Sequence, residues 1–93
     1  IESDFKQLKK LHLNSTEITD KSIQYLVKCD FKKLKNLSLN NNNLTNYAIE
    51  YLIECNFEKL LVLDLTDTKV YDYNLYRLEI KYPDCKIERD KLK

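Results

Sequence analysis

Apolar residues recur along this chain with a constant step. The step is clearest for the aromatic column, in which Phe31 stands midway between Phe5 and Phe57. A self-similarity with a period of about 20–50 residues indicates stacked units, because one unit cannot bury its apolar side alone. The other columns with this step are Leu8, Leu34 and Leu60; Leu11, Leu37 and Leu63; Leu13, Leu39 and Leu65; Ile18, Leu44 and Val70; Ile23, Ile49 and Leu75; and Leu26, Leu52 and Leu78.

A short strand is expected in the first half of each unit. Apolar and polar residues alternate over 11–13, 36–40 and 62–66, as in a strand with one buried face. The partner of each strand is the equivalent strand one unit away, so the sheet must be parallel. A fourth alternation follows Pro83, over 85–88, and predicts a final short strand.

A helical pattern follows each of the first two strands. Ile23, Leu26 and Val27 have the i, i+3, i+4 spacing of a helix with one buried face, and the same spacing returns one step later in the chain. The chain contains no Gly, so another residue must take the left-handed position that often ends a helix. Asp30 and Asn56 are expected there, because Asp and Asn tolerate a positive φ.

The segments 8–18, 34–44 and 60–70 share the form L-x-x-L-x-L-x-x-N-x-L, with Thr or Asn at the asparagine place. This pattern resembles the leucine-rich repeat. Cys29 and Cys55, at equivalent positions of two units, are similar to the cysteines of its cysteine-containing subclass. That subclass includes F-box substrate receptors and the mitochondrial ATP synthase coupling factor B.

The resemblance implies an α/β fold, a solenoid of about three strand–helix coils with its parallel sheet on the concave face. The expected organisation is a single leucine-rich-repeat domain over 1–93, with repeats at 5–30, 31–56 and 57–82 and a capping strand within 83–93. The sequence contains no Met, so we expect the chain to be part of a longer protein.

Polar positions of the predicted strands provide the candidate binding site. They alternate with the buried leucines, so a rigid sheet would hold their side chains in a fixed outward array, and binding residues favour such positions. The resemblance implies that a protein partner binds there. The candidate residues are Lys10, His12, Asn14, Asn36, Ser38, Asn40, Val62, Asp64, Thr66 and Asp67, with Ser15 and Asn41 beside Asp67 at the rim.

Two other surfaces compete with the concave face as interaction sites. Tyr25 and Tyr51 form a column beside the buried stripe of the helices, with Tyr47 nearby, and Tyr is enriched at interfaces. Half-buried packing is the alternative for this column. Lysines also gather on the segments that precede the strands, where they provide either a dock for an acidic protein or RNA phosphate, or a solvated edge. This lysine ridge comprises Lys6, Lys9, Lys32, Lys33, Lys35 and Lys59.

The composition of the chain and its isolated motifs limit the kinds of function that it can have. The formal net charge of +1 argues against an overall field for nucleic acid or a membrane, and the apolar stretches are too short for a transmembrane span. Ser15 and Ser38 lie in no nucleophile motif, and the cysteines form no C-x-x-C pair and have no histidine nearby, so neither a nucleophilic site nor a zinc site is expected. Cys29 and Cys55 are expected to pack as free thiols. We expect no catalytic, metal-binding or cofactor-binding residue.

The sequence therefore favours a protein–protein interaction module, such as a substrate receptor or adaptor, that binds through the concave face. The alternative is a structural or assembly subunit of a larger complex, for example a mitochondrial one. The expected setting is intracellular and cytoplasmic, with the mitochondrion as the alternative. The N-terminal face of Phe5, Leu8, Leu11 and Leu13 lacks a polar cap, so we expect further repeats, a capping segment or a partner subunit to cover it.

Overall fold

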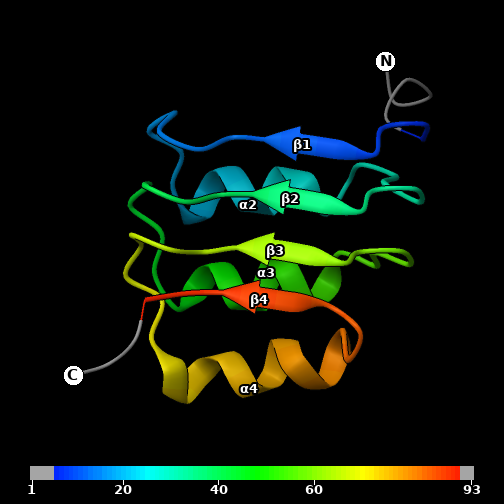
Figure 1. The fold of residues 1–93 in the computed structure, drawn as a ribbon. Coiled ribbons are helices and arrows are strands. Elements are labelled where there is room, and N and C mark those ends of the chain that lie inside the picture. Colours follow the sequence, from blue (N-terminus) through cyan, green and yellow to red (C-terminus); the bar gives the residue numbers. More distant parts are fainter. Residues whose placement is uncertain (1–5, 91–93) are drawn as a thin grey trace.

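The structure is a computed structural model that describes residues 6–90, except the side chains of Asp72 and Tyr73. Strands and helices alternate along the chain (Figure 1). None of the helices in this range is long and apolar enough to cross a membrane. The elements are β1 (Lys10–His12), α2 (Asp20–Leu26), β2 (Asn36–Ser38), α3 (Tyr47–Glu54), β3 (Val62–Asp64), α4 (Asp72–Lys81) and β4 (Lys86–Glu88).

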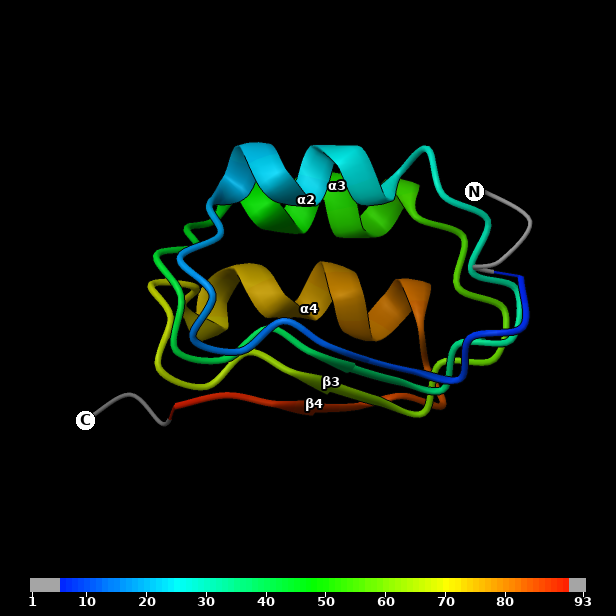
Figure 2. The same cartoon turned by 90° about the horizontal axis from the view of Figure 1, so that it is seen from above.

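The four strands form one parallel sheet in the order β1-β2-β3-β4. Leu11, Leu37 and Leu63 pair in register, as the constant step predicts, and Ile87 continues this row on β4. All three helices lie on one side of the sheet (Figure 2). The predicted α/β class with a parallel sheet is therefore confirmed. We call the opposite side, which no described helix covers, the open face.

The hydrophobic core lies between the sheet and the helices. In the second strand–helix unit, Leu34, Leu37 and Leu39 are at most 1% exposed. Complete burial of a leucine side chain contributes about 1.5–3 kcal/mol, so these columns dominate the stability of the sheet–helix contact. The same columns of the third unit are buried as well, and the core as a whole comprises Ile23, Phe31, Leu34, Leu37, Leu39, Leu44, Ala48, Ile49, Leu52, Cys55, Phe57, Leu60, Leu63, Leu65, Val70, Leu75, Leu78 and Tyr82.

An aromatic column runs along one end of the units. The rings of Phe31 and Phe57 have their centroids 6.2 Å apart, and Tyr82 extends the column at 5.8 Å from Phe57. These distances fall in the range in which tilted aromatic pairs stabilise a core. The sequence predicted the two phenylalanines but not Tyr82. Phe5, the first predicted member, lies outside the described residues.

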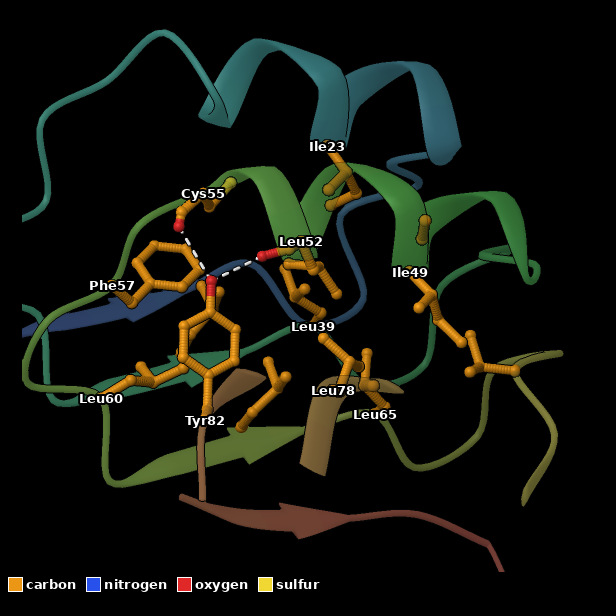
Figure 3. Close-up of a cluster of buried hydrophobic side chains, with 14 of the residues drawn as sticks. Ile23, Leu39, Ile49, Leu52, Cys55, Phe57, Leu60, Leu65, Leu78 and Tyr82 are labelled. Carbon is orange, nitrogen blue, oxygen red and sulfur yellow. Dashed lines mark hydrogen bonds between the residues drawn. The ribbon is translucent and has the colours of Figure 1, made fainter. Parts of the chain in front are cut away.

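Tyr82 also closes the C-terminal end of α3 (Figure 3). Its hydroxyl lies 2.6 Å from the carbonyl oxygen of Leu52 and 2.8 Å from that of Cys55. The last carbonyls of a helix have no partner within the helix, so this hydroxyl satisfies groups that would otherwise be buried and unpaired. Burial raises the pKa of the Tyr82 hydroxyl, and it raises the pKa of the Cys55 thiol to about 12.

The helices do not end in the way that the sequence predicted. Neither Asp30 nor Asn56 has a positive φ, so the expected left-handed stop at these residues is wrong. Helix α2 ends instead in a tighter turn, in which the N–H of Lys28 donates to the carbonyl of Tyr25 at 3.2 Å. At α3 the hydroxyl of Tyr82 takes the place of a left-handed cap.

Asn42 joins two neighbouring loops by hydrogen bonds. Its Oδ1 accepts from the backbone N–H groups of Thr16 at 3.1 Å and Ile18 at 3.2 Å. The residue is only 8% exposed, so these bonds satisfy backbone groups that stacking removes from water. Asn42 is the residue at the asparagine place of the repeated pattern over 34–44. The Nδ2 group donates to the carbonyls of Leu13, Leu39 and Asn40, at 2.9, 3.0 and 3.2 Å.

Candidate binding surface on the open face of the sheet

The strand residues of the predicted site alternate with the buried leucines and project from the open face. Those on and after β1 are exposed, whereas those on β2 and β3 are half-buried because a strand flanks each of them on both sides. Asp67 lies in the loop that follows β3. The exposed residues are Lys10, His12 and Asn14, and the half-buried ones are Asn36, Ser38, Asn40, Val62, Asp64 and Thr66.

A row of four side chains crosses the centre of this face. His12, Ser38, Asp64 and Glu88 pair in register on the four strands, with about 4.8 Å between neighbouring strands. Ser38 lies between His12 and Asp64, which differs from the nucleophile–histidine–acid order of a catalytic triad. Asp64 and Glu88 lie directly opposite each other, and like charges in this position destabilise a sheet.

Hydrogen bonds within the strands hold part of this surface in place. The Ser38 hydroxyl donates to Asn40 Oδ1 at 2.7 Å. Asp64 Oδ1 accepts from the backbone N–H of Thr66 at 3.0 Å and from its hydroxyl at 2.8 Å. The second residue of each pair lies two positions beyond the last residue of its strand, so the bonds fix the polar side chains at the point where strand becomes loop.

The middle of the face is hollowed. A depression of about 150 Å³ lies there, with carboxylates at one end and an imidazole at the other. Its floor includes apolar atoms, so it can accept a side chain with an apolar stem and a polar head. The lining residues are His12, Asn36, Leu37, Ser38, Val62, Asp64 and Glu88.

The rim of the face is formed by Ser15, Asn41 and Asp67, which occupy equivalent loop positions. All three have a positive φ, of 57°, 58° and 54°, although none is glycine. Asn41 Nδ2 donates to the Ser15 hydroxyl at 2.7 Å, so the rim is tied from one unit to the next. A groove of about 630 Å³ lies beside it, lined by Ser15, Glu17, Thr19, Asn41, Asn42, Asn43, Asp67, Thr68 and Lys69.

The two competing surfaces are also exposed. Every lysine of the lysine ridge lies at the surface, and Lys33 Nζ donates to Gln7 Oε1 at 3.1 Å. On the helices, Tyr25 is 60% and Tyr47 73% exposed, so these two side chains are more exposed than the half-buried packing considered as an alternative. Tyr51 is half-buried.

The fourth strand adds residues to the face that the sequence prediction left out. Glu88 continues the central row, and Lys86 lies in register with Val62. The constant step would place Glu88, instead of Lys86, opposite Val62, so the step is shorter between β3 and β4 than between the other strands. The alternation over 85–88 was a signal for the strand, but the shortened step concealed which row each side chain joins.

Among the described residues, no group of three or more His, Cys, Asp or Glu side chains is placed to hold a metal ion. Cys29, Cys55 and Cys85 are free thiols. No protein-family model matches the sequence, and comparison with curated proteins gives no significant match. Function therefore has to be inferred from the chemistry of the surface itself.

Proposed function

We propose that the chain is a leucine-rich-repeat solenoid domain that binds a protein partner through the open face, its concave side. The in-register row of His12, Ser38, Asp64 and Glu88 carries this proposal. A sheet backbone fixes the spacing of these side chains, and no described helix covers them. Exposed polar side chains on a rigid scaffold are typical of binding surfaces.

The composition of the face favours a polar protein surface as the partner. Positive and uncharged side chains lie on β1 and β2, whereas Asp64 and Glu88 lie side by side on β3 and β4. A partner cation between these two carboxylates would relieve their repulsion. Val62 lies next to this pair and offers an apolar contact. The face therefore has both features of a small protein interface, an apolar contact and polar groups around it.

Two substitutions on the open face test the proposal. Asn36 and Val62 pair in register at the centre of the face, and neither side chain makes a described hydrogen bond. The double variant Asn36→Tyr with Val62→Tyr should therefore block partner binding sterically without loss of fold, because aromatic side chains opposite each other are favourable in a sheet. The matched control is Gln24→Tyr with Leu61→Tyr, which replaces one amide and one aliphatic side chain by the same residue on exposed positions elsewhere.

Affinity capture of partners, quantified by mass spectrometry, should give proteins that the wild-type chain and the control variant retain and the open-face variant loses. Circular dichroism melting of all three chains checks that they fold alike. If the open-face variant retains every protein that the control retains, the face does not bind the partner. Loss from the control variant alone would move the interface to the helices or the lysine ridge, as expected for an assembly subunit.

A further inference from the structure

The outer edge of β1 carries backbone groups that no described residue pairs. On β2, the carbonyl of Ser38 accepts from the Leu13 N–H of the preceding unit at 2.8 Å, and the Asn36 N–H donates to that unit at 3.1 Å. The equivalent groups of β1 are the His12 carbonyl and the Lys10 N–H. Strand β1 pairs with β2 alone, and no described residue bonds these two groups. A strand can therefore be added at this edge.

The apolar side of β1 is also incompletely covered. Leu11 and Leu13 are half-buried, whereas Leu37 and Leu39, at the same positions of β2, are at most 1% exposed. The difference arises because the leucines of β2 have a unit on both sides. A segment that adds to β1 and alternates apolar and polar residues would cover Leu11 and Leu13 with every second side chain.

The charge at this edge selects the partner. The stretch from Lys6 to Asn14 contains three lysines and no carboxylate, and Lys10 projects from the open face beside the unpaired edge. Continuation of the sheet by β4 of a second copy, in the register that the existing pairs share, would place Lys86 opposite Lys10. Two-fold pairing of β1 edges would bring the lysines of both copies to one seam. Both forms of self-association would place like charges opposite each other, which is unfavourable.

We propose that the β1 edge binds an extended segment of a different protein as a fifth strand, with acidic side chains toward the open face and apolar ones toward the helices. Main-chain hydrogen bonds to Lys10 and His12 supply affinity, and alternate side chains supply specificity. A carboxylate opposite Lys10 distinguishes this segment from a second copy of the chain. The site is separate from the centre of the open face.

The first test uses a synthetic peptide of alternating leucine and aspartate, followed by amide spectra of the isotope-labelled chain. We expect saturable binding, shifts centred on residues 9–14 and slower hydrogen exchange of the Lys10 amide. A peptide of alternating leucine and lysine, and the aspartate peptide with methylated backbone nitrogens, should bind at least about fivefold more weakly. Absence of saturable binding, equal binding of all three peptides, or shifts centred on β4 would overturn the proposal.

A pair of variants tests the role of charge. Lys10→Glu should weaken binding of the aspartate peptide about fivefold or more and strengthen binding of the lysine peptide. Lys86→Glu is the matched control, because Lys86 is an exposed lysine at the same register position of the other edge strand, and it should leave both affinities unchanged. If the two variants changed the affinities equally, the affinity would depend only on the net charge of the chain, and a site at β1 would be refuted.

Discussion

Asn42 is the residue whose replacement should be most informative about how the units are held together. It is the one polar residue among the buried described residues, and its side chain bonds backbone groups of two units. Replacement by Ala removes the acceptor of the Thr16 and Ile18 amides and the donor to the carbonyls of Leu13 and Leu39. The new methyl group replaces none of these bonds.

The size of the effect follows from the surroundings of those groups. The bond to Leu39 is buried, whereas those to Thr16, Ile18 and Leu13 are partly buried, so water can replace some of them. A buried group that loses its partner costs about 1–3 kcal/mol, and we therefore expect Asn42→Ala to lower the free energy of unfolding by about 3 kcal/mol. For a chain of this size that corresponds to a fall in Tm of about 15 °C.

Two further variants separate the hydrogen bonds from other effects. The hydroxyls of Thr16 and Thr68, at the equivalent places, each donate to a carbonyl three residues earlier, at 2.5 and 2.7 Å. Asn42→Thr should keep such a bond to Leu39 and lose those to the preceding loop, so we expect about half of the full effect. Asn43→Ala, at the exposed neighbour, should change the stability by less than about 0.5 kcal/mol.

Urea titration followed by circular dichroism measures these differences, and native-state hydrogen exchange of the Thr16 and Ile18 amides locates them. Both amides should exchange faster in Asn42→Ala and in Asn42→Thr but not in Asn43→Ala. A loss of less than about 1 kcal/mol in Asn42→Ala, or unchanged exchange of these amides, would refute the view that Asn42 holds the two loops together.

Two further predictions concern buried groups at the other end of the units. Tyr82→Phe removes the hydroxyl bonded to two carbonyls at the end of α3, so the free energy of unfolding should fall by about 1.5 kcal/mol in urea titration, whereas Tyr76→Phe, on an exposed ring, should leave it unchanged. Burial raises the pKa of the Cys55 thiol from 9.0 to about 12 and that of the Cys85 thiol to about 11. The folded protein therefore holds the two thiol protons more tightly than the unfolded chain does. The free energy of unfolding should fall as the pH rises above 9. Alkaline titration by circular dichroism should show this loss, with a smaller slope in Cys55→Ala. Both thiols should be alkylated more slowly in the native state than in denaturant, because the thiolate is the reactive form, and equal rates would contradict the burial of Cys55 and the partial burial of Cys85.

The sheet and its register could be predicted from the sequence because each strand repeats the same apolar alternation. Leu11, Leu37 and Leu63 could pair in only one way that keeps all the columns buried. The helix ends could not be predicted in the same way. The carbonyls at the end of α3 are bonded by Tyr82, which lies far beyond Cys55 in the sequence, and a local pattern contains no signal for a partner so distant.

The side chains of the open face could be predicted from the sequence as far as β3, after which the step between equivalent residues becomes shorter. Side chains on β1, β2 and β3 follow the alternation, but a shorter step before β4 puts Lys86, and not Glu88, opposite Val62. The left-handed backbone of Ser15 had no signal either, since Ser does not favour this conformation. Its N–H donates to the carbonyl of Asn40 at 3.1 Å, so the stacking of the units helps to hold the turn at Ser15.

The hydrogen bonds between the loops of successive units end differently at the two edges of the sheet. The amides of Ser15 and Asn41 donate to backbone carbonyls of the next unit, at 3.1 and 3.0 Å. At the third position, the Asp67 N–H donates to the Oδ2 atom of Asp90 at 2.8 Å, so a carboxylate of the chain itself closes the series. At the opposite end the carbonyl of Asn14 has no described donor. Because no described residue closes this series at the β1 end, the acidic strand proposed above should bind at the β1 edge, and substitutions at the centre of the open face should leave that binding intact.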